Sequence, residues 1–488
     1  MMRLLRGIAI ALGALALLLA VLIARALALP SRQLHPAPAP PLAVDAKAAS
    51  ERLAAAIRFP TVSRQVEAET DRAPFDALQA WLAETYPAMH AALARERIST
   101  GALLYTWTGR RAELEPVLLL AHQDVVPADP AGWSHPPFAG EIADGFVWGR
   151  GAVDDKGSLV GICEAVEGLA ARGFAPERTV LLAFGQDEEV GGEEGAQRVA
   201  ALLAGRGVHA AVAIDEGMGV LTGGLVPGMA RPVAGIAIAE KGYATLELRA
   251  TAEGGHSSTP PPHTAVGILA QAVNALERDQ MPARLGDVTG GFFAYLAPEM
   301  PFWFRVPLAN ASLFAPLITP FVGGVPALNA LFRTTTAATM LSAGTKENVL
   351  PTRATAIVNF RILPGDTVQG VVDHARRAIA DPRVEVVLLE GSREPSPVSP
   401  VGDERFAMLQ RTIGEVFPDA IVAPALTLGG TDLREYSSVS DHLYRFAPEV
   451  ATPADLKRIH GIDERMSVDG FADAVRFYTR FIENASAP

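Results

Sequence analysis

The sequence predicts an α/β fold in two parts, because short apolar strands alternate with helices and a second, different pattern interrupts them. At 488 residues the chain is too long for one hydrophobic core, since cores stop growing near about 250 to 300 residues. Continuous apolar runs separated by helices indicate a mainly parallel sheet covered by helices on both faces. These runs cover residues 116–121, 179–185 and 209–214, and a helix is expected over 158–171.

A smaller α+β domain is expected over 240–392, inserted between the two pieces of the larger domain, 47–239 and 393–488. Strands and helices within the insert are expected over 243–252, 264–277, 354–362, 367–379 and 384–390. Helices on one face of a sheet are typical of the α+β class. Near the C-terminus, an amphipathic helix that closes the larger sheet is predicted by helical spacing of Phe471, Val475, Tyr478 and Ile482.

The N-terminus predicts export. Arg3 and Arg6 precede 18 uncharged residues from Gly7 to Ala24, a length between that of a signal-peptide core and a membrane-spanning helix. The positive-inside rule places the rest of the chain outside the cytoplasm. Residues 1–28 are therefore interpreted as a signal peptide or a membrane anchor, with a buried core helix as the alternative. The protein is expected to be anchored on the non-cytoplasmic side, or secreted or periplasmic. The proline-rich residues 29–46 are expected to form an extended spacer.

The amino-acid composition indicates which kinds of partner the protein binds. The net charge of -12 lacks the basic surface that nucleic acids require, so a peptide or small-molecule substrate is favoured. Cys163 is the single cysteine, which leaves no intramolecular disulfide to stabilise the fold.

Three of the apolar strands end in a histidine or in carboxylates. His122-Gln123-Asp124 follows the first, Glu188-Glu189 follow the second, and Asp215-Glu216 follow the third. Active sites lie at the carboxyl ends of strands in such sheets, where acids are costly to desolvate unless paired or metal-bound. Residues two apart on extended backbone face the same side, so Asp124 can accept the imidazole N–H of His122 and turn the other nitrogen toward a metal.

Further potential ligands come from two loops. Asp154 and Asp155 precede the 158–171 helix, and His460 stands in a loop before the final helix. For Asp155 we prefer a helix N-cap, whereas the nearby acids favour a metal ligand at Asp154. Histidine and carboxylate ligands together suit zinc or a similar divalent cation better than calcium. Two imidazoles with several carboxylates can hold two ions, and a shared carboxylate can bridge them at about 3.5 to 4 Å.

The segments HQDVVP, GRGAVDDKGS, DEEVGG, IDEG, GGHSSTP and HGIDER resemble, in order and spacing, those of the co-catalytic zinc peptidases. That family includes carboxypeptidase S, aminoacylase, carnosinase and the secreted N-fatty-acyl-amino acid synthase/hydrolase. The resemblance runs from about Ala46 to the C-terminus. It is greatest to carboxypeptidase S and the fatty-acyl-amino acid enzyme, because of residues 295–318.

The resemblance implies a zinc-peptidase catalytic domain with a ferredoxin-like lid or dimerisation domain inserted in it. It implies two zinc ions per subunit, or other divalent metals, with Glu188 as the general base. Asp154 would bridge the ions, one completed by His122 and Asp215 and the other by Glu189 and His460.

The smaller domain and one loop supply further candidates. The resemblance places His256 at the oxyanion in the active site of a partner subunit, so it implies a homodimer or a domain closure. Arg361 could grip a substrate carboxylate through two hydrogen bonds, and Asn348 could assist at the oxyanion; a surface ion pair and a turn residue are the alternatives. Gly430 and Thr431 lie in GGTDLREY, which resembles the family's substrate loop except for the leucine after its aspartate.

These residues together predict a zinc-dependent hydrolase of amide or peptide bonds next to a free C-terminal carboxylate, acting on short peptides or N-acyl amino acids. The alternatives are an aminopeptidase or deacetylase on the same scaffold and a non-catalytic, membrane-tethered binding protein. Residues 291–332, with only Glu299 and Arg305 charged, are expected either to pack inside the smaller domain or to form an apolar surface for an acyl chain or membrane.

Overall fold

The α/β class is confirmed by the computed structural model, which describes residues 2–37, 42–224, 228–311, 313–314 and 323–487. Within these residues, eight strands form a mixed central sheet in the order β1-β2-β6-β3-β7-β16-β8-β15. Strands β3 and β6 are buried throughout, as expected for a sheet covered on both faces. The strands are β1 (Ala94–Ile98), β2 (Ala102–Trp107), β3 (Val117–His122), β6 (Val180–Gly185), β7 (Val212–Leu221), β8 (Val233–Glu240), β15 (Ile421–Thr427) and β16 (Leu443–Ala451).

Strand direction places the predicted site at one edge of this sheet. Strands β3, β6, β7 and β16 pair in parallel, so their carboxyl ends meet on the same side. A separate small sheet of β4 (Glu141–Ala143), β5 (Phe146–Trp148) and β17 (Arg465–Ser467) joins the loop before α5 to the segment before the last helix.

Helices form hydrophobic cores on both faces of the central sheet. One core contains residues of α2 (Ala46–Ile57), α3 (Ala73–Thr85), α4 (Pro87–Ala92), α5 (Lys156–Ala171), α13 (Glu404–Val416) and α14 (Val468–Ala485). The other contains α6 (Ala196–Gly205) and the 3-10 helix η4 (Asp432–Ser438). Helix α14 is the C-terminal helix predicted from the spacing of Phe471, Val475, Tyr478 and Ile482, all of which are buried.

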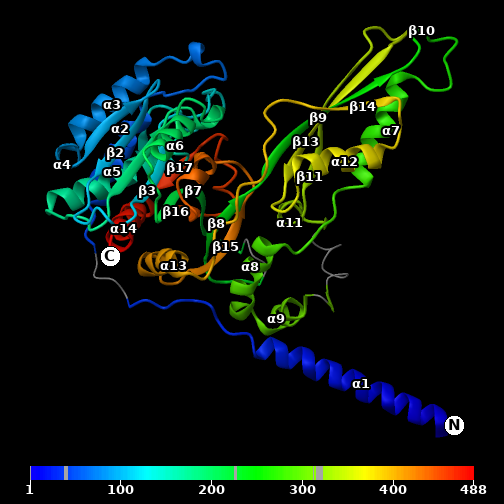
Figure 1. The fold of residues 1–488 in the computed structure, drawn as a ribbon, viewed down its shortest axis with the longest axis horizontal. Helices are drawn as coiled ribbons and strands as arrows, with labels where there is room; N and C mark the ends of the chain where they lie inside the picture. The colour runs from blue at the N-terminus through cyan, green and yellow to red at the C-terminus, as the bar shows by residue number, and fades with distance from the viewer. Residues whose placement is uncertain (1, 38–41, 225–227, 312, 315–322, 488) are drawn as a thin grey trace.

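A smaller sheet extends away from the central one (Figure 1) and has its own core. Its antiparallel order is β11 (Thr335–Ala343), β13 (Arg353–Ile362), β9 (Gly242–Thr251) and β14 (Val384–Leu388), with α7 (Ala265–Arg278) and α12 (Val368–Ile379) packed against it. Side chains along β9 alternate between buried and partly exposed, as in a sheet with one covered face. The short pair β10 (Gly255–His256) and β12 (Val349–Leu350) forms its far tip.

The N-terminal segment forms one long helix, α1 (Met2–Leu27), which is long and apolar enough to cross a membrane. In the proline-rich segment after it, Gln33 is hydrogen-bonded to the backbone of Val422 in β15, and the role of residues 29–46 as a spacer stays a prediction. The apolar segment 291–332 divides into α8 (Asp287–Leu296), which packs on β15, and α9 (Phe302–Ala309), which contacts α1. Helix α11 (Pro326–Phe332) ends the segment, and residues 312 and 315–322 lie outside the described residues.

Where β8 passes into β9, Glu240 forms a buried ion pair with Arg445 of β16. Arg445 Nη2 and Nε lie 2.6 and 3.0 Å from Glu240 Oε1, and both side chains are almost fully buried. Replacing Arg445 with Met leaves the carboxylate of Glu240 desolvated and short of its main partner. We therefore expect a loss of about 3 to 5 kcal/mol, measured as a lower urea midpoint.

The surface pair of Arg206 and Glu96 supplies the matched control, because its two side chains are 43% and 40% exposed. Arg206→Met is expected to change stability by no more than about 1 kcal/mol. Equal shifts in the two variants would contradict the account of the Glu240–Arg445 pair.

Candidate metal centre

Five acidic or histidine side chains from separate segments meet at the carboxyl edge of the central sheet. His122 ends β3, Glu189 lies in the turn after β6, Glu216 lies on β7, and Asp154 precedes α5. His460 comes from the long connection between β16 and β17. The segments meet because parallel strands point their carboxyl ends the same way.

Asp154 lies between the two imidazoles, with one carboxylate oxygen toward each. His122 Nε2 is 3.0 Å from Asp154 Oδ1, and His460 Nε2 is 2.9 Å from Asp154 Oδ2. Glu216 Oε1 lies 3.5 Å from His122 Nε2, and Glu189 Oε2 lies 3.1 Å from His460 Nε2. A carboxylate placed between two imidazoles in this way can be shared by two cations.

The ligand atoms are close enough to surround cations. Three groups, each with ligand atoms within 4.8 Å of one another, are found in the described part of the chain. They are His122 with Asp154 and Glu216, Asp154 with Glu189 and His460, and His122 with Glu188 and Glu189. The donor set of imidazole nitrogen and carboxylate oxygen suits zinc or a related divalent cation.

Asp124 holds His122 in place, as expected from the HxD spacing. His122 Nδ1 lies 3.0 Å from the backbone oxygen of Asp124 and 3.3 Å from its Oδ1, which leaves Nε2 facing the cluster. The buried Asp124 carboxylate also accepts the Ser63 hydroxyl at 2.7 Å and the backbone N–H groups of Glu188 and Glu189 at 3.2 and 3.1 Å. It therefore fixes both the imidazole and the turn that carries the two glutamates.

Glu464 is a positioning residue that sequence reasoning missed. Its buried carboxylate accepts the backbone N–H groups of Val153 and Asp154 at 2.9 and 3.1 Å, and it pairs with Arg150 at 2.5 Å. Through these contacts the segment after His460 sets the loop that carries Asp154. The HGIDER segment contains this glutamate, but nothing in the sequence alone indicates which backbone it binds.

Electrostatics in the cluster follow from crowded carboxylates. Burial raises the pKa of Glu188 well above its usual range, with nearby acids adding to the effect. Hydrogen bonds to Asp154 and Glu189 raise the pKa of His460 to about 10. An imidazole must be neutral to bind a metal, so metal binding here is coupled to proton release.

Among the described residues, Asp215 belongs to none of the three candidate ligand groups, and its role as a metal ligand stays a prediction. Its Oδ1 accepts the backbone N–H of Glu216 at 2.9 Å, and its Oδ2 accepts that of Leu433 at 3.0 Å. The pairing of β7 with β16 is irregular between Asp215 and Met218, and of the two acids only Glu216 has an oxygen in a candidate ligand group. The structure therefore places Glu216, where Asp215 was expected, beside His122 and Asp154.

Asp155 is the N-cap residue of α5, as we expected. It precedes α5, but its side chain makes no capping hydrogen bond. Instead Asp155 Oδ2 accepts the backbone N–H of His122 at 3.2 Å, so this buried acid supports the end of β3.

The candidates from the smaller domain lie apart from the cluster in this conformation. His256 and Asn348 are neighbours at the β10–β12 tip, where Ser257 N donates to Asn348 O at 3.2 Å. Figure 1 shows this tip far from the carboxyl edge of the central sheet. Arg361 is exposed on β13, with its guanidinium carbon 5.0 Å from the centroid of the Tyr243 ring.

The predicted substrate loop, which contains Gly430 and Thr431, lies where the central sheet passes into the smaller domain. Thr431 N donates to Glu240 Oε2 at 2.8 Å, and Arg434 Nη2 lies 3.2 Å from the same oxygen. A side chain at Gly430 would displace the guanidinium group of Arg434. Gly430 and Thr431 are thus tied to the point where β8 leaves the central sheet.

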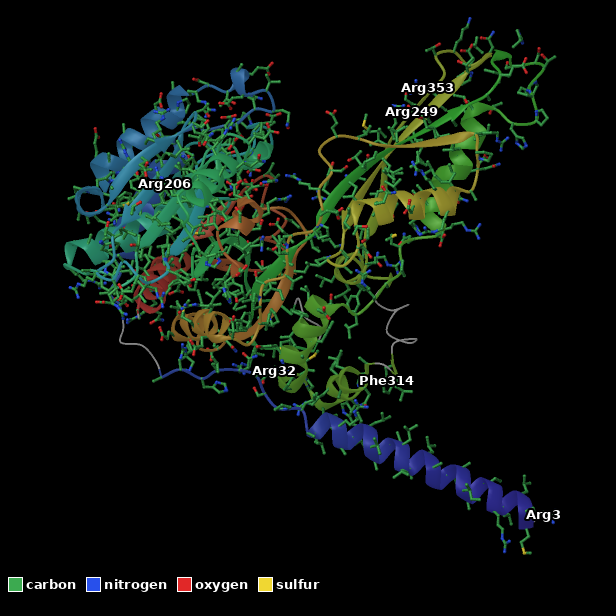
Figure 2. All side chains as sticks on the ribbon, in the orientation of Figure 1. Arg3, Arg32, Arg206, Arg249, Phe314 and Arg353 are labelled. Atoms are coloured by element: carbon green, nitrogen blue, oxygen red, sulfur yellow. The ribbon has the colours of Figure 1, made fainter. Side chains whose placement is uncertain are left out.

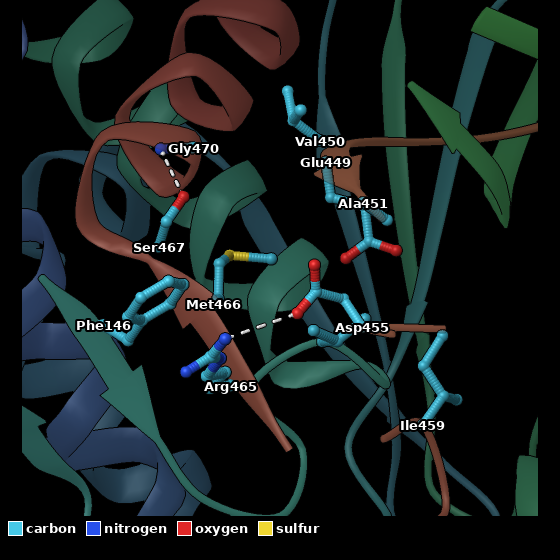
Figure 3. A pocket seen from close by; sticks show the side chains of 11 residues that line it. Phe146, Glu449, Val450, Ala451, Asp455, Ile459, Arg465, Met466, Ser467 and Gly470 are labelled. Atoms are coloured by element: carbon cyan, nitrogen blue, oxygen red, sulfur yellow. Dashed lines mark hydrogen bonds and ion pairs between the residues drawn. The ribbon is translucent and has the colours of Figure 1, made fainter. Parts of the chain in front are cut away.

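A cavity lined in part by Val153, the neighbour of Asp154, is not the metal site. It is lined by Val153, Glu449, Asp455, Arg465 and their neighbours, with Arg465 Nη2 3.6 Å from Asp455 Oδ1 (Figure 3). Its lining shares no residue with the three candidate ligand groups.

Imidazoles and carboxylates gathered at the carboxyl edge of an α/β sheet are typical of metal-dependent hydrolases. The family model described as peptidase family M20/M25/M40 matches residues 118–484. The probable carboxypeptidase S-like 2 of Dictyostelium discoideum is 40% identical over 441 residues, which cover 89% of this chain and 84% of that protein. The N-fatty-acyl-amino acid synthase/hydrolase PM20D1 of Mus musculus is 40% identical over 447 residues, covering 90% and 88%.

Solved structures share the fold at low sequence identity. An M20 family metallo-carboxypeptidase from Sulfolobus solfataricus has a TM-score of 0.64 at 18% identity, covering 90% of this chain and 99% of that one. Human carnosine dipeptidase 1 has a TM-score of 0.63 at 14% identity, covering 90% and 96%. The chain belongs to peptidase family M20/M25/M40. It is a metallopeptidase or amidohydrolase that hydrolyses amide bonds, which confirms the resemblance and the enzyme class predicted from the sequence.

Proposed function

We propose that the cluster holds two zinc ions that share Asp154. His122 and Glu216 would complete one site, and Glu189 and His460 the other. The observation that carries this proposal is the Asp154 carboxylate, which has an imidazole nitrogen 3.0 Å from one oxygen and 2.9 Å from the other. Bound ions of this kind supply the Lewis acidity that polarises an amide carbonyl and lowers the pKa of a water molecule.

Glu188 is the proposed general base. Its raised pKa and its place beside His122 suit a carboxylate that takes a proton from the attacking water and delivers it to the leaving nitrogen. Asp124 acts through His122 by fixing the ring.

The proposed substrates carry a free carboxylate next to the amide bond, as in N-acyl amino acids and short peptides cut at the C-terminal residue. The names of the relatives, carboxypeptidase S-like and N-fatty-acyl-amino acid synthase/hydrolase, support this class. Arg361 is exposed and free of an acidic partner among the described residues, so its guanidinium is available for a carboxylate. Gly430 and Thr431 are proposed to line the substrate loop.

Turnover of a substrate compared with turnover of its C-terminal amide tests whether Arg361 binds the substrate carboxylate. The wild-type enzyme is expected to prefer an N-acyl amino acid over the matching amide by about 100-fold or more in kcat/KM. Closure of the smaller domain over the substrate would bury the pair between Arg361 and the substrate carboxylate, and a buried charge pair contributes several kcal/mol. Arg361→Ala should remove most of this preference, while Arg353→Ala on the same strand should keep it. Equal turnover of acid and amide by the wild-type enzyme would favour the aminopeptidase or deacetylase alternative.

The smaller domain, 240–392, is proposed to act as a lid and dimerisation domain. Strand β11 is at the edge of its sheet, and Met340 and Leu341 on it are 65% and 68% exposed. An exposed apolar edge strand is suited to pairing with a second copy. In such a homodimer, His256 of the partner subunit would reach the oxyanion with Asn348 beside it.

The protein is proposed to be exported, with residues 1–28 retained as an anchor on the non-cytoplasmic side or removed by cleavage. Helix α1 supports this proposal, because its most apolar 18-residue window has mean hydropathy 2.8 and is only 6% buried. Residues 47–239 and 393–488 are proposed as the catalytic domain, joined to α1 through residues 29–46.

A further inference from the structure

The C-terminal end of α1 is fixed to the body of the protein. Leu22 and Ala26 are its buried residues, α9 contacts it, and Asn310 Nδ2 donates to the backbone oxygen of Leu22 at 3.2 Å. Figure 1 shows α1 leaving the body beside α9 and projecting away from it.

The residues just after α1 strengthen this attachment. Gln33 Nε2 donates to the backbone oxygen of Val422, and Val422 N donates to Gln33 Oε1, both at 2.9 Å. Gln410 Nε2 donates to the backbone oxygen of Arg32 at 3.0 Å, and the Arg32 guanidinium carbon lies 5.4 Å from the Tyr295 ring centroid. Helix α1 and the catalytic sheet are therefore held in one arrangement.

Helix α9 presents uncovered aromatic side chains next to α1. Trp303 is 81% exposed, more than any other large apolar side chain in the described residues, and Phe304 is 43% exposed. The sequence of α9, FWFRVPLA, holds one charge, Arg305, which donates to the backbone oxygen of Met300. Large aromatic side chains left in water are costly, so this surface indicates a partner.

The length of α1 indicates which partner covers the aromatic side chains of α9. Its 26 residues span about 39 Å, which exceeds the hydrocarbon thickness of about 30 Å. Arg3 and Arg25 mark its two ends, and side chains along α1 project into open space in Figure 2. When α1 spans a bilayer, Leu22 and Ala26 reach the outer interface, and α9 is beside them. Trp side chains are enriched at that depth because they combine an apolar ring with a hydrogen-bonding N–H.

We propose that α9 is an interfacial membrane element, with Trp303 and Phe304 inserted into the outer leaflet at the headgroup level. The body of the enzyme then rests on the bilayer, with α8 between the membrane and β15. This inference rests on the part of the proposed function in which α1 is retained as an anchor.

Fluorescence quenching tests the depth of Trp303. Full-length protein is reconstituted in phosphatidylcholine vesicles whose acyl chains carry bromine near the headgroup, and intact mass establishes that α1 is retained. Bromine quenches tryptophan only on contact, so the wild-type protein should lose emission relative to unbrominated vesicles. Trp303→Phe should abolish this loss, whereas Trp133→Phe, which removes a tryptophan from the catalytic domain, should keep it.

The possible failures are distinguishable. Quenching that persists in Trp303→Phe, or that is absent from wild-type protein in vesicles, would overturn the interfacial role and leave the anchor intact. A change in the oligomeric mass of Trp303→Phe would also overturn the interfacial role, because a second copy of the chain would then cover α9. A mature chain that begins after Ala28 and stays in solution would contradict the anchor itself.

Discussion

Glu188→Gln is expected to keep both metal ions and to lose about 10²- to 10⁴-fold in kcat. The amide preserves the size of the side chain but cannot accept and return the proton that general acid–base catalysis requires. Metal content by mass spectrometry and steady-state kinetics on an N-acyl amino acid measure the two quantities on the same preparation.

The neighbouring glutamate is the matched control for this prediction. Glu189 Oε2 lies 3.1 Å from His460 Nε2, and it belongs to the candidate group with Asp154 and His460. Glu189→Gln should therefore lose metal as well as activity. If Glu188→Gln lost metal to the same extent, Glu188 would be a ligand, because it also belongs to a candidate group with His122 and Glu189.

Glu216→Gln is expected to remove the metal ion beside His122 and to lower kcat/KM by more than about 100-fold. This is a larger loss than the about 10- to 100-fold expected when a residue that only supports a metal ligand is changed. The reason is geometric, since Glu216 Oε1 lies 3.5 Å from His122 Nε2. Metal stoichiometry per chain, together with activity at saturating zinc, provides the measurement.

Asp215→Asn is the control beside it. The Asp215 oxygens accept backbone N–H groups of Glu216 and Leu433, and an asparagine can keep one of these bonds. This variant should retain two ions and most activity. Loss of one ion in Asp215→Asn with full metal in Glu216→Gln would restore the ligand set implied by the family resemblance.

The sequence was sufficient for the fold class and for the gathering of most candidate ligands. Apolar runs predicted β3, β6 and the start of β7, and strand direction placed His122, Glu189 and the acids of β7 at one edge. Which of two adjacent acids faces the cluster could not be predicted. The pairing of β7 is irregular between Asp215 and Met218, so the alternation of a regular strand does not decide which acid faces the cluster.

Long-range polar contacts explain the other features of the structure that could not be predicted from the sequence. Gln33 pairs with Val422, 389 positions away, so a segment with the composition of a spacer is docked on the body. Glu464 accepts a hydrogen bond from the backbone N–H of Asp154, 310 positions away, and the composition of a segment does not predict such a specific contact. The role of His256 depends on a second chain or on closure of the smaller domain, neither of which a single sequence specifies.

Anomalous X-ray scattering at the zinc edge tests most directly whether two cations share Asp154. Crystals of zinc-loaded protein are predicted to show two peaks per chain, one beside His122 and Glu216 and one beside Glu189 and His460, about 3.5 to 4 Å apart. A single peak, or peaks that do not both lie against the Asp154 carboxylate, would contradict the account.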